Sequence, residues 1–103
     1  MQIQVTKGEH NLIKRRRKGL TQVQLAAQQG RFQVNVMQEE QDETPHGVIK
    51  INDHEYCFLM RRRSGLSHRK AAAAMGFSHQ TLAVKERKAD PEIVEFWQNY
   101  FKG

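Results

Sequence analysis

Two short stretches of the chain alternate apolar and polar side chains, whereas most of the remaining chain follows a helical spacing. Residues 2–5 and 48–51 have the period of two and the β-branched side chains that favour strands. Each stretch stands just before a helical segment. A pseudo-two-fold pairing of the two stretches would satisfy the hydrogen-bonding groups along both strand edges. We therefore expect two short paired strands in an otherwise helical fold.

Polar capping signals predict where the helices begin. Thr6 with Glu9, and Asn52 with Glu55, have the N-cap and N3 spacing that satisfies the unpaired amides of a helix start. A second and a third helix are expected after each of these. In the first half they begin at Thr21 and, less clearly, at Phe32, and in the second half they begin at Ser67 and Ser78. Glycines that supply the positive φ of a tight turn are expected to end the first two helices of each half: Gly19, Gly30, Gly65 and Gly76.

A last helix is predicted from Asp90, with Pro91 and Glu92 in its first turn. Its apolar side chains share one face: Ile93, Val94, Trp97, Tyr100 and Phe101. Such a stripe usually belongs to a core, and a self-association face is the competing interpretation.

The order of these elements occurs twice in the sequence. At an offset of 46 residues, 12–21 fall on 58–67, and the glycines, alanines and capping residues align in the same ungapped register. We interpret this as a tandem duplication, with a boundary at the turn-forming residues 44–47. The expected organisation is a first repeat over 1–46, a second over 47–89 and a C-terminal helix over 90–103.

The charge of the chain indicates a polyanionic partner. Its 103 residues carry 17 Lys and Arg against 11 Asp and Glu, a net charge of +6. Nucleic acid is the first interpretation and an anionic membrane surface the second. No apolar run is long enough to cross a bilayer and the N-terminus lacks the apolar block of a signal peptide, so we expect a cytoplasmic protein without a membrane partner.

Enzymatic and metal chemistry are disfavoured by the same residues. The single cysteine, Cys57, lies within the apolar face of an expected helix, where a thiol would be buried and inert. His46, Asp53, His54 and Glu55 lie close in sequence, but no helical His pair has the four-residue spacing of a zinc site. We therefore expect no enzyme activity, no cofactor and no metal.

The second repeat resembles the helix-turn-helix of Cro and lambda-repressor-type regulators, the XRE family. The resemblance rests on the caps, glycines and apolar positions of residues 57–88: Gly65, Leu66, Ser67, Ala72, Gly76, Phe77, Ser78, Leu82 and Glu86. Lys85 departs from it by replacing an apolar residue, and Lys88 by replacing a frequent glycine, so the recognition helix is expected to run longer or to pack differently. The implied fold is mainly α with two short β-strands, as tandem helix-turn-helix repeats plus a C-terminal helix.

The first repeat matches the same pattern less well. Gln29, Arg31 and Glu39 stand at positions that the family fills with apolar residues, and Phe32 replaces the cap. Its third helix runs into the acidic segment 39–43, whose charge has the wrong sign for contact with phosphate. We interpret this repeat as a diverged copy whose contact with DNA is an open question.

The resemblance implies which side chains meet DNA. The third helix of the second repeat would direct Ser78, His79, Gln80, Thr81 and Val84 toward the major groove, where Gln80 can address adenine and Val84 a thymine methyl. His68 would touch phosphate or brace Gln80. The phosphate candidates are basic: Arg69, Lys70, Arg87 and Lys88, with Arg61, Arg62 and Arg63 at the end of the first helix. The corresponding candidates of the first repeat are Gln22, Gln24, Gln33, Val34, Asn35 and Gln38, flanked by Arg15 to Lys18 and Arg31.

These observations predict a sequence-specific transcriptional regulator, a repressor from a phage, plasmid or other mobile element that binds an inverted repeat of double-stranded DNA as a homodimer. One alternative is an antitoxin or protein-interaction module that holds a protein partner through residues 39–43 or the last helix and binds DNA secondarily. The other is an architectural or excision factor that bends DNA.

Overall fold

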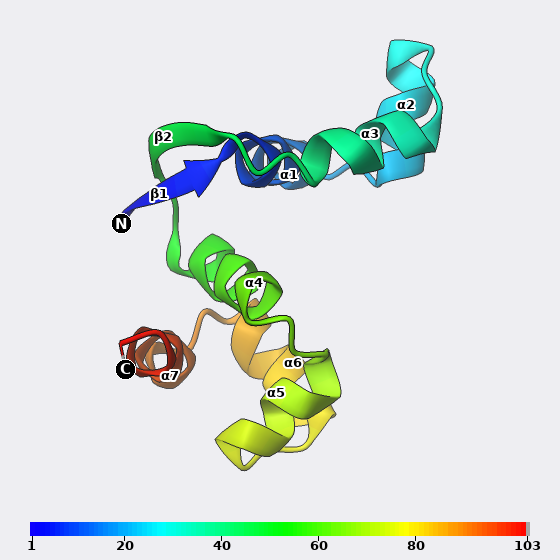
Figure 1. Ribbon diagram of the computed structural model, residues 1–103. Coiled ribbons are helices and arrows are strands. Elements are labelled where there is room, and N and C mark those ends of the chain that lie inside the picture. Colours follow the sequence, from blue (N-terminus) through cyan, green and yellow to red (C-terminus); the bar gives the residue numbers. More distant parts are fainter. Residues whose placement is uncertain (103) are drawn as a thin grey trace. The chain divides into compact units, whose positions relative to one another are not determined.

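The structure is a computed structural model that describes residues 1–102, and its elements follow the sequence repeat (Figure 1). In chain order the elements are β1 (Gln2–Thr6), α1 (Lys7–Arg17), α2 (Gln22–Gln29), α3 (Gln33–Glu40), β2 (Pro45–Lys50), α4 (Asp53–Ser64), α5 (His68–Met75), α6 (His79–Arg87) and α7 (Pro91–Tyr100). The expectation of a mainly α fold with two short strands is confirmed.

The chain divides into two compact units. The first unit is Gln2–Lys50, and the second unit is Met1 together with the chain from Ile51 onward. The helices of the two units begin 46 residues apart, as the repeat predicts. The equivalent pairs are α1 with α4, α2 with α5, and α3 with α6.

The predicted caps start the helices. The Thr6 hydroxyl accepts from the Glu9 amide at 3.1 Å and the Glu9 carboxylate accepts from the Thr6 amide at 3.0 Å, with the same reciprocal pair at Asn52 and Glu55. Side chains also cap four other helices: Thr21, Ser67, Ser78 and Asp90. Phe32 has no side-chain acceptor to offer α3. There only the Asn35 side chain contributes, accepting from the Phe32 amide at 3.3 Å.

The two strands pair antiparallel, as predicted, with Gln2 opposite Lys50 and Ile3 opposite Ile49. Both strands lie within the first unit, although the repeat assigns the second of them to the start of the second copy. β1 and β2 therefore pair within the first unit, and the boundary between the two units lies between Lys50 and Ile51.

The turn predicted over 44–47 is displaced. β2 already begins at Pro45, directly after the short connection over residues 41–44. Two backbone bonds hold this connection against the start of α1, from the Lys7 amide to the Thr44 carbonyl at 2.8 Å and from the Gly8 amide to the Asp42 carbonyl at 2.9 Å. At Gly8 a β-carbon would lie 2.5 Å from the Glu40 carbonyl oxygen, so the approach requires glycine.

Each unit has an apolar core made from equivalent positions. Ile13 and Leu59, Ala26 and Ala72, and Val36 and Leu82 are buried in their respective units. The second unit adds α7, which packs against α4 and buries Ile93 and Trp97 completely. Trp97 is therefore a core residue of its own unit and not part of a self-association face. Tyr100 and Phe101, near the end of the chain, remain about half exposed.

Candidate nucleic-acid interface

Each unit contains a pair of short helices joined by a three-residue turn (Figure 1). In the second unit α5 ends at Gly76, whose φ of +81° is in the left-handed region, and α6 starts after the Ser78 cap. In the first unit Gly30 ends α2 in the same way, with a φ of +65°. The inner faces of these pairs are filled by alanine and by Val36 or Leu82, which leaves the outer faces of α3 and α6 open.

The outer face of α6 presents the predicted base-reading side chains. His79, Gln80, Thr81 and Val84 are exposed, and none of the four has an acidic partner among the contacts of the described residues. Ser78 accepts from the Thr81 amide at 3.2 Å, so it fixes the helix start. The chemistry available on this face is that of an imidazole, an amide, a hydroxyl and an isopropyl group.

Basic side chains flank that face on both helices of the pair. Arg69 and Lys70 lie in the first turn of α5, and Arg87 and Lys88 lie at the end of α6. All four are exposed, as is Arg62 on α4. The structure thus combines an uncharged exposed strip on α6 with four cations near the ends of the helix pair.

Arg61 and His68 are engaged within the unit instead of being free at its surface. The Arg61 Nε donates to a Glu86 carboxylate oxygen at 3.1 Å, and the His68 Nε2 lies 3.6 Å from the other oxygen. These contacts tie α4 and α5 to α6. Arg61 and His68 thus help to position α6, and Glu86 is the acidic partner of His68.

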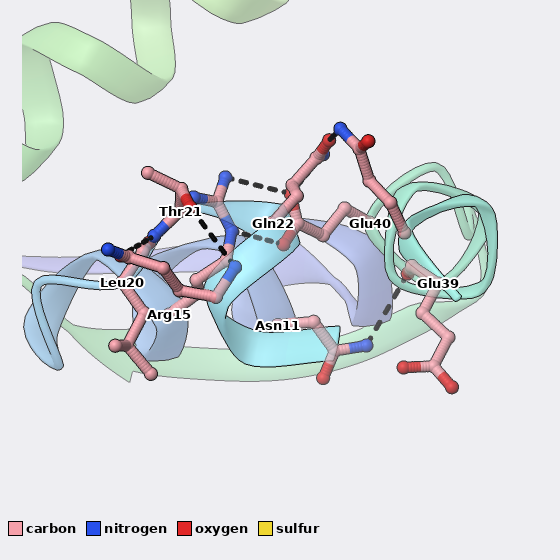
Figure 2. Close-up of polar contacts among 9 residues, drawn as sticks. Asn11, Arg15, Leu20, Thr21, Gln22, Glu39 and Glu40 are labelled. Atoms are coloured by element: carbon pink, nitrogen blue, oxygen red, sulfur yellow. Dashed lines mark hydrogen bonds and ion pairs between the residues drawn. The ribbon is translucent and has the colours of Figure 1, made fainter. Parts of the chain in front are cut away.

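The first unit contains the same network in a tighter form, and sequence reasoning missed it in both units (Figure 2). The Arg15 Nε and Nη2 donate to the two Glu40 carboxylate oxygens at 2.6 and 3.0 Å, and the Gln22 amide donates to Glu40 at 3.1 Å. Gln33 in turn donates to the Gln22 side chain at 3.4 Å, which joins the first turns of α2 and α3. Arg15 and Arg61, like Glu40 and Glu86, are separated by the repeat offset, which is the signal that could have identified the pairs.

Lys85, which departs from the family pattern, joins α6 to the start of α7. Its ammonium lies 4.9 Å from the centre of the Phe77 ring and 3.2 Å and 3.4 Å from the carboxylates of Glu92 and Asp90. The hydrogen bonds that the Lys85 ammonium donates to Glu92 and, with a smaller effect, to Asp90 raise the pKa of Lys85. The Lys85 side chain thus makes an aromatic contact with Phe77, and its charge is paired with carboxylates of the same unit.

The second departure, Lys88, alters how α6 ends. The helix stops at Arg87 and Lys88 keeps a right-handed conformation, so the positive φ that a glycine would adopt falls on Ala89, at +53°. α6 accordingly ends at Arg87.

At the positions equivalent to the flanking cations, the first unit carries no basic residue. Arg69, Lys70, Arg87 and Lys88 of the second unit correspond to the following residues of the first: Val23, Gln24, Gln41 and Asp42. The exposed face of α3 is also less polar at one position, because Val34 occupies the position equivalent to Gln80 of α6.

The acidic segment 39–43 is largely paired within the first unit. Arg31 donates to Glu39, which raises the pKa of Arg31 and lowers that of Glu39, while Glu40 is buried on Arg15. The Asp42 carboxylate accepts from the Thr44 amide at 2.9 Å, and hydrogen bonding with Thr44 lowers the pKa of Asp42. These three acids are therefore engaged in contacts of the unit itself.

Cys57 is fully buried, as expected, and burial raises the pKa of its thiol to about 12, with Glu86 and Asp53 adding to the shift. A thiol with such a pKa is almost entirely protonated at neutral pH and is a poor nucleophile. Within residues 1–102 no three His, Cys, Asp or Glu side chains gather as metal ligands would. Over the same residues, no helix has the length and apolar character needed to cross a membrane.

Comparisons of the chain with protein-family models, with curated proteins and with solved structures find no match.

Proposed function

We propose that the protein is a sequence-specific DNA-binding transcriptional regulator of the XRE helix-turn-helix type, without enzymatic activity, that acts in the cytoplasm as a repressor from a mobile element. One observation carries the proposal. The exposed, uncharged face of α6 is flanked by four exposed cations, Arg69, Lys70, Arg87 and Lys88, while the charged residues Arg61 and Glu86 are paired behind it.

The two parts of this surface have different roles in DNA binding. The flanking cations neutralise phosphates and set the orientation of the helix pair on the duplex, which supplies affinity without sequence preference. The side chains of α6 enter the major groove, where the Gln80 amide has the donor and acceptor that adenine presents and the Val84 methyls suit a thymine methyl. His79 both donates and accepts, and so adds a further polar contact.

The bound form is a homodimer on an inverted repeat, with one α6 from each chain in successive major grooves. The first unit lacks the four cations, so it is a poor second reader for the same chain. Two chains related by a two-fold axis supply two equal recognition helices, and binding of this kind occludes polymerase at a promoter.

Binding-site selection with the full chain tests the proposal. His79→Ala combined with Gln80→Ala should remove sequence preference and leave nonspecific binding, because each lost base contact costs about 1–3 kcal/mol of discrimination. Gln98→Ala with Asn99→Ala, at exposed positions of α7, is the control and should keep the preference. An unchanged preference in the α6 variant would refute the assignment of the recognition helix.

The salt dependence of affinity tests the cations separately. Replacing Lys70 or Arg87 with Ala should lower the slope of log affinity against log salt concentration by about one, because one fewer counterion is released. A wild-type affinity for DNA that does not depend on salt would contradict the proposed phosphate contacts.

A further inference from the structure

At three equivalent positions the first helix pair exposes an apolar side chain where the second has a polar or basic one: Val23 for Arg69, Phe32 for Ser78 and Val34 for Gln80. Four large hydrophobic side chains of the first helix pair are exposed to solvent. Phe32 is 79% exposed and Val23 is 57% exposed, and Val34 and Met37 on α3 are 47% and 39% exposed. We call Val23, Phe32, Val34 and Met37 the apolar face. The bond between Gln22 and Gln33 joins the helix turns from which Val23 and Val34 extend.

Phe32 is a poor choice for the helix that it precedes. It occupies the N-cap position of α3 without a side-chain cap, whereas Ser78 caps α6 at the equivalent position. A Ser, Thr, Asp or Asn there would stabilise the helix relative to an apolar residue, because its side chain accepts from a free amide of the first turn. The most exposed apolar side chain of the unit therefore stands where local stability favours a small polar one, which indicates a surface role for the ring.

The surroundings of the apolar face fit a second copy of itself. Its polar neighbours are amides, Gln24, Gln33 and Gln38, and each amide has both a donor and an acceptor, so identical side chains can bond across a two-fold axis. The charge next to Phe32, on Arg31, is paired with Glu39. A face with an apolar centre, an amide rim and no net charge is self-complementary, which an interface between identical chains requires.

We propose that the apolar face of the first unit is the dimerisation surface of the protein and that it binds the same face of a second copy. Phe32 is its most exposed member, and the first helix pair serves association where the second serves DNA. The proposal deepens the proposed function, on which its meaning for operator binding rests, but association itself is measured without DNA.

The chain supplies its own replacements for the test. Phe32→Ser and Val34→Gln introduce the residues that the second unit has at Ser78 and Gln80, so both suit this helix pair, and the serine adds a cap to α3. Sedimentation equilibrium of the full chain should show a dimer for the wild type and a dissociation constant raised about tenfold or more for the double variant. Circular dichroism and a thermal midpoint that is unchanged or higher would show that lost association is not lost folding.

Two controls identify the surface. Val48→Thr changes an apolar residue that is 63% exposed on β2 of the same unit, and Phe101→Ser changes an exposed aromatic residue beyond α7. Both variants should remain dimers. A monomeric wild type, a dimer that Phe32→Ser with Val34→Gln leaves intact, or a dimer that Phe101→Ser dissociates would each overturn the proposal.

DNA binding separates this proposal from the previous one. If the protein dimerises through the apolar face but shows no sequence preference, the inference stands and the proposed function fails. If the protein is a monomer without DNA, binds its site, and loses binding on Phe32→Ser with Val34→Gln, the first helix pair contacts DNA and the inference fails.

Discussion

The ion pair between Arg15 and Glu40 should be the strongest single polar interaction of the first unit, and a double-mutant cycle can measure it. Arg15→Met keeps most of the apolar stem and removes the charge, and Glu40→Gln keeps the shape of the acid. The Glu40 side chain is 4% exposed and that of Arg15 is 14% exposed. Each single substitution therefore leaves its partner charged and largely removed from water.

The magnitude follows from the bonds that are lost. Removing Arg15 takes two donors from the Glu40 carboxylate, whose contact with the Gln22 amide at 3.1 Å remains, and a buried charge that loses its ion-pair partner costs about 3–5 kcal/mol. Since Arg15 retains some contact with water, we expect about 3 kcal/mol for Arg15→Met and a coupling energy of about 2 kcal/mol. A unit of this size has a total stability of roughly 2.5–7 kcal/mol, so the variant should unfold to a measurable extent.

The equivalent pairs provide an internal scale. Arg61 and Glu86 are joined by a bond of 3.1 Å between side chains that are 23% and 14% exposed, which predicts a coupling of about 1 kcal/mol. At Arg31 and Glu39 the side chains are 34% and 49% exposed, and water reduces the expected coupling below that of the other two pairs. The ranking of the three pairs is therefore fixed by burial.

Amide hydrogen exchange on the full chain is the suitable assay, because a single melting curve would combine the two units. Arg15→Met should accelerate exchange in the first unit and leave the second unit unchanged. A coupling energy below about 0.5 kcal/mol for Arg15 and Glu40, or one smaller than that of Arg61 and Glu86, would refute the argument from burial.

Two further predictions concern a strained residue and a histidine pair. Ala89→Gly should stabilise the second unit by about 1 kcal/mol, because Ala89 has a φ of +53°, whereas Ala73→Gly within α5 should destabilise it by a similar amount; amide hydrogen exchange of the second unit measures both. Burial, followed by the charges of His46, Lys14 and Arg17, holds the pKa of His10 below its ordinary 6.5, while the His10 and His46 rings stack at 3.9 Å. The unfolded state then binds more protons than the folded state. The stability of the first unit, fully present above pH 6.5, should therefore fall as the pH drops from 6.5 toward the lower pKa of the folded state. His10→Gln should flatten this profile in amide hydrogen exchange measured across the same pH range.

The local elements of the fold were predictable because their signals are local. A capping residue and its partner three positions later fix a helix start whatever surrounds them, so Thr6, Thr21, Asn52 and Ser67 marked the helices correctly. The turn at 44–47 was misplaced because Pro45 also suits the first residue of an edge strand. Backbone hydrogen bonds to the start of α1 favour the strand over the turn, and these bonds join residues far apart in the sequence.

The candidate site was predictable only in part for the same reason. Which residues of α6 are exposed follows from helical period, and His79, Gln80 and Val84 are indeed exposed. The period of α4 gives no sign that Arg61 pairs with a carboxylate 25 residues later while its neighbour Arg62 stays exposed. Such pairing depends on tertiary packing, so a run of basic residues cannot be divided by sequence alone into those that bind phosphate and those that hold the fold.

The two units also show why the surface of a repeat changes more readily than its frame. Replacing an exposed residue such as Arg69 by valine, as at position 23, costs the fold little, usually within about 0.5 kcal/mol, whereas replacing Glu40 removes several kcal/mol. The first unit differs from the second at exposed positions, yet its arginine and glutamate are closer and more deeply buried than the equivalent pair, at 2.6 against 3.1 Å. A copy that had only lost its function would be expected to loosen at both kinds of position. The firm frame and altered surface therefore favour a first unit that serves a different partner, which is the basis for assigning its apolar face to association and the basic face of the second unit to DNA.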